Sequence, residues 1–295
     1  MRCDLHVHTR HSGMCGVPLL GAVCRESYNH PQAVYQKLKR LGMDLVTVTD
    51  HDSIGAVETL RSWPDFFLSE EVTCKLPAGT ELHVGVYDIT ERDHIELERR
   101  REDFESLTSY LDERGLFYSA NHVFSSLTGR RALEDFELFA TAFPAIETRN
   151  GHMLACANLS AALLADWSAR AEVGGSDAHA MRSVGCAYTV VPGARDKREF
   201  LEGLRRGRGR VRGQVGGFWK LTRDVLAIGR NMVRENPWTL PIATLGVAVP
   251  LVVLGNYIVE NAFARWWMAR CRRARALGSW KVGAGGAVPV AQVLS

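Results

Sequence analysis

The sequence lacks the paired cysteines, the strong net charge and the apolar leader that would each assign a chain to a simple class. Its seven cysteines are scattered without a CxxC pair, which argues against a disulfide framework or zinc ribbon and indicates reduced thiols. A net charge of +3 over 295 residues is too small to predict a nucleic-acid binder. Asp4 and His6 interrupt the N-terminus before any apolar stretch, so no secretory leader is predicted.

What the chain does have near its start is a pair of histidines, His6 and His8, separated by one residue. Residues 2–9 are expected to form a strand, in which residues two apart point to the same face. Both imidazoles can therefore aim at one point, and imidazole is the commonest metal-binding side chain. The pair predicts half of a metal site.

Helical and strand patterns alternate from there to about Gly213. A helix is expected to begin at Pro31 and end at Gly42, and the apolar stretch 43–49 follows as a strand. The next helix is expected to use Asp52 or Ser53 as its N-cap, and a long helix is expected over 91–114. Further strands are predicted in FFLSEEVTC, TELHVGVYDI, LFYSANHVF, PAIETRN and AEVGGSDAH. This order predicts a parallel α/β architecture, most simply a closed barrel.

Polar side chains gather where the predicted strands end. In a parallel barrel these ends share one face, which carries the active site. So much histidine and carboxylate exceeds what one structural zinc ion needs, and it predicts two or three divalent metals with shared ligands. The strand-end residues are His51, His83, His122, Glu147, Asp177 and His179, and His6, His8 and Glu71 are expected to meet them.

In this order, the motifs HVH, TDHD, EEVT, ELHV, ANH and SDAH resemble the PHP (polymerase and histidinol phosphatase) family over about residues 1–213. The resemblance is greatest to its nucleotide and oligonucleotide phosphoesterases with a trinuclear centre. It implies a distorted (β/α)7 barrel that hydrolyses phosphoesters with two or three Mn, Fe or Zn ions. The metal ligands that it implies are His6, His8, His51, Glu71, His83, His122, Asp177 and His179.

The chain departs from the family pattern at one place. The family usually has an Asp five residues after the second histidine, where this chain has Gly13. The family Asp also stands five residues before the helix-opening proline, and here that position is Glu26. We therefore expect residues 13–25 to be an insertion, with Glu26 replacing the Asp. If Glu26 is instead a solvated loop residue, the centre holds two metals. The insertion is expected to form part of a lid through Pro18, Leu19, Leu20 and Val23.

Roles beyond metal binding follow as expectations. A hydroxide bridging the metals is expected to attack phosphorus in line, without a covalent enzyme intermediate. His122 or His179 is expected to protonate the leaving oxygen, and Asp50 to orient His51 or its neighbours. Candidates for binding a second phosphate or a sugar edge are Arg10, His11, Arg149 and Asn150, for which surface ion pairs or caps are the alternative.

The chain changes character after Gly217. Residues 214–235 are expected to form an amphipathic linker, and 236–259 then run for 24 residues without a charge. About 20 apolar residues can cross a bilayer. Trp238 and Tyr257 lie near the ends of this run, and arginines flank it on both sides. We expect a transmembrane or membrane-associated helix over 236–260, followed by a basic and then flexible tail over 261–295.

The topology of this tail has three alternatives. One is a single span that keeps the barrel on the cytoplasmic face of the membrane. Another is a re-entrant hairpin broken near Pro250 and Gly255, and the third is a segment lying at the membrane surface. The basic run 205–212 is expected to be a solvated turn before the last strand, so nucleic acid is expected only as a substrate.

The leading interpretation is a metal-dependent phosphoesterase tethered to a membrane, acting on a nucleotide, an oligonucleotide or a small phosphorylated metabolite. Within enzymes, the alternatives are a metal-dependent amidohydrolase and a phosphatase for sugar or amino-alcohol phosphates. Outside enzymes, the alternative is a catalytically silent, membrane-bound PHP module that binds or regulates. The complete set of implied ligands favours an active centre.

Overall fold

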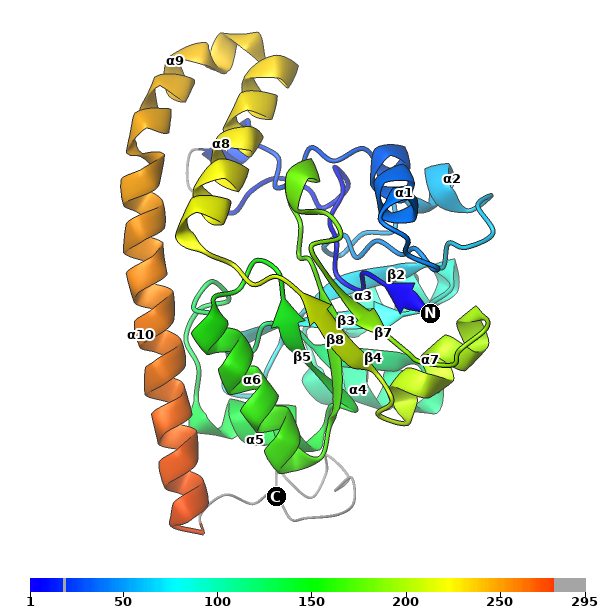
Figure 1. The fold of residues 1–295 in the computed structure, drawn as a ribbon. Helices are drawn as coiled ribbons and strands as arrows, with labels where there is room; N and C mark the ends of the chain where they lie inside the picture. Colours follow the sequence, from blue (N-terminus) through cyan, green and yellow to red (C-terminus); the bar gives the residue numbers. More distant parts are fainter. Residues whose placement is uncertain (18–19, 279–295) are drawn as a thin grey trace.

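The computed structural model describes residues 1–17 and 20–278 as a mixed α/β protein with two sheets and a long C-terminal helix along one side (Figure 1). Pro18 and Leu19 of the predicted lid, and residues 279–295 of the predicted flexible tail, lie outside the described residues. Within the rest of the insertion, Leu20–Ala22 forms a 3-10 turn, and Met14 and Arg25 form an isolated antiparallel bridge.

The larger sheet has five strands in the order β2-β3-β4-β5-β6. Strands β2 (Ser69–Lys75), β3 (Glu81–Tyr87) and β4 (Phe117–Ala120) pair antiparallel. Strands β5 (Ala145–Asn150) and β6 (Ala171–Gly175) continue the sheet from β4 in parallel. The predicted strands in this region are confirmed, but the expected wholly parallel sheet is wrong because β3 runs antiparallel to both neighbours.

The smaller sheet has the order β1-β7-β8, all antiparallel: β1 (Arg2–Cys3), β7 (Ala187–Val190) and β8 (Arg210–Gly213). Isolated parallel bridges, such as Val7 to Ala178, lie between the sheets. Regular pairing therefore does not close a barrel among the described residues. The expected strands 2–9 and 43–49 are mainly extended chain, partly because side chains replace ladder bonds: the Val7 amide donates to Thr49 Oγ1 at 3.1 Å, and Thr47 Oγ1 donates to the Phe67 carbonyl at 2.8 Å.

Helices cover the sheets. The prediction that a helix begins at Pro31 is confirmed, and Gly42 follows its end with a φ of +78° that glycine adopts easily. The basic run is a turn between a helix and β8, as predicted. The helices of the first 213 residues are α1 (Pro31–Arg40), α2 (Val57–Leu60), α3 (Glu91–Arg100), α4 (Phe104–Glu113), α5 (Leu133–Thr141), α6 (Ala155–Ser168), the 3-10 turn Met181–Ser183 and α7 (Lys197–Arg205).

Two helix predictions need correction. The single helix expected over 91–114 is broken into α3 and α4, because the Asp103 side chain accepts a hydrogen bond from the Ser106 amide and starts a new helix. After the TDHD motif, α2 has only four residues and begins after Ala56. Asp52 cannot cap it, because its carboxylate accepts from the Thr73 amide at 2.7 Å and pairs with Arg101 at 2.9 Å.

The C-terminal part forms a helical hairpin. Helix α8 (Phe218–Glu235) leads through η3 (Pro237–Thr239), α9 (Leu240–Ala243) and η4 (Thr244–Ala248) into α10 (Val249–Ala276). The break in the apolar run thus spans 237–248. A break near Gly255 is wrong, since Gly255 lies inside α10, and Pro250 occupies the first turn of that helix, where its missing amide hydrogen costs nothing.

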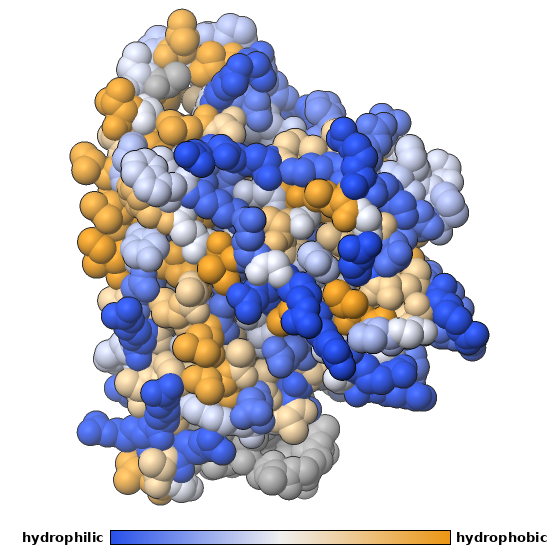
Figure 2. Space-filling model, viewed as in Figure 1, coloured by the Kyte–Doolittle hydropathy of each residue, from blue (hydrophilic) through white to orange (hydrophobic). Residues whose placement is uncertain are grey.

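Helix α10 has two differently placed halves. Its second half packs on α5 and α6 and adds Ala264, Trp267, Met268 and Cys271 to the largest hydrophobic core cluster. Its first half and α9 leave apolar residues uncovered, visible as orange along the upper left edge in Figure 2. Pro237–Ala276 is long and apolar enough to cross a membrane, and 6% of its most apolar window is buried.

Candidate metal centre

The first two histidines lie side by side at the end of the N-terminal extended segment. The Nε2 atoms of His6 and His8 are 3.0 Å apart, and both rings are buried. The Asp4 carboxylate fixes the backbone here by accepting hydrogen bonds from the amides of His6, Ser176 and Gly185. The expectation that both rings point at one place is confirmed.

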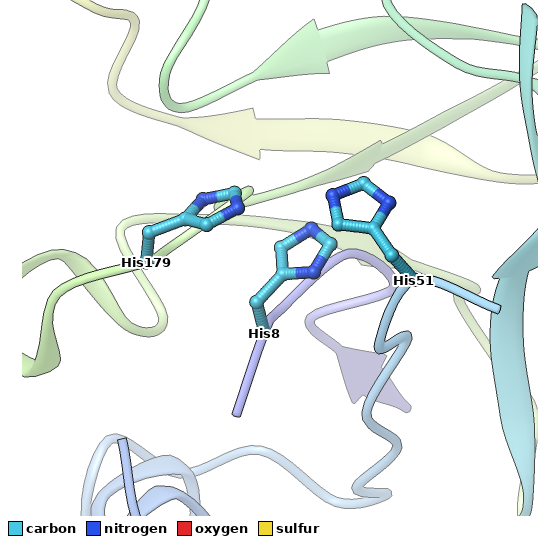
Figure 3. A group of neighbouring side chains, drawn as sticks. All are labelled: His8, His51 and His179. Atoms are coloured by element: carbon cyan, nitrogen blue, oxygen red, sulfur yellow. The ribbon is translucent and has the colours of Figure 1, made fainter. Parts of the chain in front are cut away.

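His8 also belongs to a cluster at the rim of the centre, with His51 and His179 (Figure 3). The His8 ring stacks on both, with centroids 4.5 Å from His51 and 4.1 Å from His179. Glu26 faces the same pair: its carboxylate oxygens lie 3.7 Å from His51 Nε2 and 3.9 Å from His179 Nε2. Glu26 therefore stands within reach of the centre, where the insertion argument expects it.

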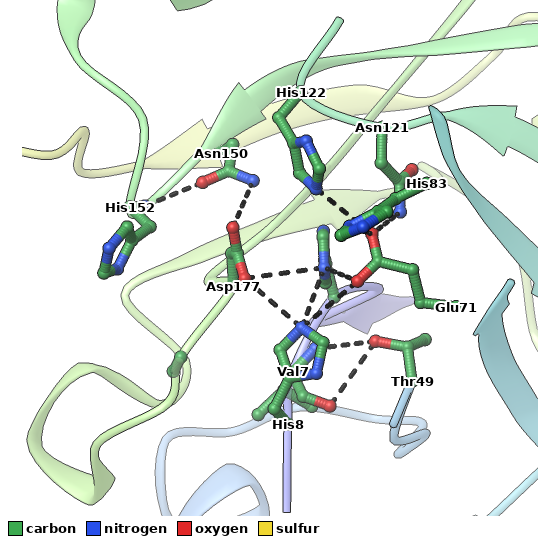
Figure 4. A network of polar contacts seen from close by, with 12 residues as sticks. Val7, His8, Thr49, Glu71, His83, Asn121, His122, Asn150, His152 and Asp177 are labelled. Carbon is green, nitrogen blue, oxygen red and sulfur yellow. Dashed lines mark hydrogen bonds and ion pairs between the residues drawn. The ribbon is translucent and has the colours of Figure 1, made fainter. Parts of the chain in front are cut away.

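Glu71 is the hub of the buried part of the centre (Figure 4). It lies on β2 with no exposed surface. Its Oε2 is 3.1 Å from His6 Nε2 and 3.3 Å from His51 Nδ1. Its Oε1 is 3.2 Å from His122 Nε2 and 3.6 Å from His83 Nδ1. One carboxylate thus joins histidines from four separate segments.

Asp177 closes the opposite side. Its Oδ1 lies 3.3 Å from His8 Nε2, and 3.5 Å from both His6 Nε2 and His179 Nδ1. Asp177 and His122 both have positive φ, +49° and +31°, just beyond the ends of β6 and β4. Non-glycine residues rarely adopt this conformation, and where they do it often serves to direct a functional side chain.

These side chains fit a set of divalent metal ions. Four overlapping groups of three have ligand atoms within 4.8 Å of one another. The ring nitrogens His83 Nδ1 and His122 Nδ1 are buried without a hydrogen-bond partner among the described residues, an arrangement that suits metal binding. The groups are His8-His51-His179, His6-His8-Asp177, His6-Glu71-His122 and His51-Glu71-His83.

The electrostatics of the cluster are strongly coupled. Burial alone would raise the pKa of Glu71, but His6, His83 and His51 outweigh it and hold that pKa well below its ordinary value. Burial alone would lower the pKa of His6, but Glu71 and Asp177 hold it well above the ordinary value. The pKa of His8 is well lowered by burial and by its histidine neighbours. Neutral imidazole and ionised carboxylate are the forms that bind metals.

A second layer of polar residues holds the ligands in place. Ser12 Oγ lies 3.0 Å from His8 Nδ1 and donates to Asp50 Oδ1 at 2.7 Å. Asp50 is therefore linked through Ser12 to His8, whose ring stacks on His51; Asp50 was expected to orient His51 or its neighbours. Glu147 Oε1 lies 2.9 Å from His6 Nδ1, and Asn150 Nδ2 donates to Glu147 and Asp177 at 2.9 and 3.0 Å.

The predicted substrate-binding residues have different places. Asn150 is committed to the chain itself, since its Oδ1 also accepts from the His152 and Met153 amides. Arg10 pairs with Glu235 at 3.0 Å, at the end of α8. The His11 amide donates to Thr9 Oγ1 at 3.3 Å, and Arg149 Nε is buried without a hydrogen-bond partner among the described residues.

Several residues of the second layer carried no role in the sequence reasoning. The sequence predicts Glu147 only as a strand-end carboxylate, and it predicts no role for Ser12, Asn121 or His152. Asn121 Nδ2 donates to Glu71 at 2.9 Å, and burial lowers the pKa of His152 to about 4. Asn121 directly precedes the predicted ligand His122, and His152 lies two residues after Asn150. Nothing in the sequence shows which of these polar neighbours turn inward.

Residues 156–208 match the family model described as "PHP-associated". This match confirms the resemblance to the PHP family that the ordered motifs indicated. The chain is also 31% identical over 83 residues to an uncharacterized protein of Methanocaldococcus jannaschii, covering 28% of this chain and 44% of that protein. The chain therefore spans less than half the length of this relative.

Among solved structures, PsfC from Pseudomonas syringae is similar with a TM-score of 0.52 at 19% identity, covering 79% of this chain and 98% of that one. This likeness shows a shared fold. A lesion-specific endonuclease from Pyrococcus furiosus has a TM-score of 0.48 at 17% identity, over 71% of this chain and 57% of that one. At that level the likeness supports no argument about function.

Proposed function

We propose that the chain is a metal-dependent phosphoesterase with a multinuclear centre. The observation that carries the proposal is a closed ring of ligand groups. His8, His6, Glu71 and His51 each belong to two of the four groups, so that each group shares a ligand with the next. Shared ligands hold metals close enough to act on one phosphate, which is how multinuclear hydrolases work.

The direction of approach follows from burial. His6, His8 and Glu71 form the floor of the centre, with side chains at most 1% exposed. His51, His83 and His179 form the rim, at 15%, 21% and 16%. A phosphate group can therefore reach the centre from the rim side, where Glu26 also stands at 32% exposure.

Each residue then has a definite task. The eight predicted ligands and Glu26 would hold the metals, and Asp50, Ser12, Glu147 and Asn150 would keep those ligands oriented. Bound divalent metals would make water acidic enough to supply hydroxide near neutral pH and would offset charge on the phosphate. In hydrolysis the water oxygen joins phosphorus, the ester P–O bond breaks, and a proton passes to the leaving oxygen. The attacking water supplies that proton.

The test uses the full-length protein, freed of metal and reloaded with Mn²⁺. We expect two or three metal ions per chain by elemental analysis, together with release of p-nitrophenol from p-nitrophenyl phosphoesters. His8→Ala should lose at least one metal and almost all hydrolysis. His30→Ala is the matched control, because His30 is exposed and its side chain caps nothing at the start of α1.

Two results would contradict the proposal in different ways. A reloaded protein that binds no metal would favour the silent binding module. A protein that binds metal but hydrolyses none of the phosphomonoesters and phosphodiesters offered would remove the phosphoesterase assignment while leaving the metal centre.

A further inference from the structure

The end of the C-terminal hairpin, residues 237–259, carries an unusual amount of uncovered apolar surface; we name it the hairpin tip. Val247 is 88% exposed and Leu251 is 71% exposed. Isolated apolar residues at a surface are ordinary, but a continuous apolar patch is typical of a binding surface. The other large exposed hydrophobic residues of the tip are Trp238, Leu240, Leu245, Val252, Leu254, Ile258 and Val259.

The tip ends where α10 becomes part of the folded core. The Ser126 amide donates to the Glu260 carboxylate at 3.0 Å, and the Ser126 hydroxyl donates to it as well. Beyond this point Ala264, Trp267, Met268 and Cys271 are buried in the main core. Residues after Val259 therefore cannot leave the protein without opening that core.

This attachment sets how far the tip can enter a membrane. The part of α10 before Glu260 runs from Val249 to Val259, which at 1.5 Å per residue is about 16 Å long. One side of it packs on α8 through Val253, which is buried against Leu154 and Leu221, and its other sides are exposed. The apolar interior of a bilayer is about 30 Å thick. This part of α10 is therefore too short to span a bilayer, so the tip can occupy at most one leaflet, and the folded part beyond Val259 stays outside the membrane.

The surroundings of the tip suit an interface with anionic lipid. Trp238 in the tip is 67% exposed, and Arg230 and Arg234 are exposed near the end of α8 that leads into the tip. Tryptophan and arginine are the residues that membrane interfaces favour. The three acidic residues of 214–278 do not oppose this, because Asp224 and Glu260 are buried and Glu235 is in ion pairs.

The tip is also tied to the mouth of the metal centre. Glu235, the last residue of α8, lies just before the tip and pairs with Arg10 at 3.0 Å and with Arg25 at 3.1 Å. Arg10 follows the ligand His8 by two residues, and Arg25 precedes Glu26. A cavity of about 160 Å³ opens between these segments, lined by the apolar side chains of Met14, Val23 and Trp238 as well as by Arg25 and Glu235.

We propose that the hairpin tip inserts into one leaflet of an anionic membrane, and that the metal centre hydrolyses phosphoesters of amphiphiles held in that membrane. The substrate's phosphate enters at the rim formed by Glu26, His51 and His179, while its apolar part stays beside Trp238 and the tip. The substrate class rests on the proposed phosphoesterase function. The membrane attachment does not.

The test compares full-length protein with Leu251→Glu/Val252→Glu, and uses Ala269→Glu as the matched control on an exposed position of the core-packed half. Flotation is measured with phosphatidylcholine vesicles containing phosphatidylglycerol. We expect the unmodified and control proteins to float with the vesicles and the double variant to float at least 10-fold less. Hydrolysis of soluble p-nitrophenyl phosphoesters with Mn²⁺ should be equal in all three.

The substrate class is tested with phosphatidic acid in the same vesicles against glycerol 3-phosphate in solution. We expect phosphate release from the lipid to be at least 10-fold faster at equal concentration, and this preference to disappear in the double variant. Flotation without any Mn²⁺-dependent phosphate release would defeat the phosphoesterase proposal and leave the membrane attachment standing. Equal rates on both substrates would overturn the amphiphile assignment.

Failure of the unmodified protein to float would overturn the attachment itself. If that protein is a dimer in solution and the double variant is a monomer, the tip is a contact between two copies of the chain. Either result would leave soluble phosphoester hydrolysis unaffected, so the two proposals fail separately.

Discussion

Two neighbouring carboxylates on β2, Glu70 and Glu71, are both fully buried and both face histidine, yet their pKa values shift in opposite directions. Glu71 meets five histidines, four of which outweigh burial and hold its pKa well below the ordinary value. Glu70 points to the other face of the strand, where His94 Nδ1 lies 2.6 Å from its Oε2, and burial raises its pKa. Glu71 therefore faces histidines from several segments, as a metal-binding carboxylate would, whereas Glu70 is paired with a single histidine.

The difference follows from the alternation of side chains along a strand. Glu70, His94 and Glu98 also lie close enough together to hold an ion, but the facing nitrogen of His94 is already bonded to Glu70. Around Glu71, by contrast, each of four histidines also takes part in a neighbouring ligand group or leaves a ring nitrogen without a partner. Glu70 Oε1 and Glu98 Oε1 are also buried without a hydrogen-bond partner among the described residues, but their group shares no residue with another. Shared ligands between neighbouring groups, more than burial, distinguish the site around Glu71.

The strongest test of this comparison is the same substitution at both positions. Glu71→Gln should lower phosphoester hydrolysis by about 10³-fold, because it removes the charge that two ligand groups share. Glu70→Gln should retain the full metal content and hydrolysis within about twofold. Elemental analysis and initial rates on the Mn²⁺-loaded proteins measure both; equal losses in the two variants would show that the faces of β2 are not functionally distinct.

A change one layer away from the metals should have a smaller effect. Asp50→Asn weakens the chain from Asp50 through Ser12 to His8, and outer-layer changes of this kind usually cost about 10–100-fold in metal affinity or activity. Metal titration of the stripped protein measures the loss. Asp166→Asn on the exposed face of α6 is the control, and unchanged affinity in Asp50→Asn would remove the positioning role.

The partner of Glu70 should matter for stability and not for chemistry. His94→Ala leaves the buried Glu70 without its hydrogen bond, which should cost about 1–3 kcal/mol in the free energy of unfolding. Denaturant titration measures this cost, and hydrolysis by the folded variant should be unchanged. A drop in metal content would instead place His94 in a metal site.

The smallest effect is expected at Asp93, a carboxylate that accepts hydrogen bonds from several side chains and faces no histidine cluster. Asp93 lies in the first turn of α3. Hydrogen bonds from Arg114, Thr90 and Tyr110 outweigh burial and keep its pKa well below the ordinary value. A lowered pKa stabilises the fold above the unfolded value near 4, and the gain is lost as the pH falls toward the folded value. Asp93→Asn should therefore cost about 1–2 kcal/mol at neutral pH, and unfolding curves should converge with those of the unmodified protein as the pH drops below about 4.

The sequence predicted the ligand cluster better than the architecture around it. His122 and Asp177 come together because they follow the ends of β4 and β6, a pattern visible in the letters, and Glu71 reaches them from within β2. The lack of regular strand pairing over 2–9 and 43–49 was not predictable, because it depends partly on side-chain hydrogen bonds such as those of Thr47 and Thr49. The break at Asp103 was missed because the helical pattern continues across it, and its capping geometry is set by the fold.

The second half of α10 has a consequence for how the protein is made. Residues 264–271 complete a core whose other members begin at Val72, so nearly the whole chain must leave the ribosome before that core can close. The apolar tip is synthesised just before those residues, while the barrel is still open. Segments that expose apolar surface at this stage are prone to aggregate. The apolar tip is therefore exposed for as long as the core is incomplete. A chain that ends at residue 217 would lack these core residues altogether.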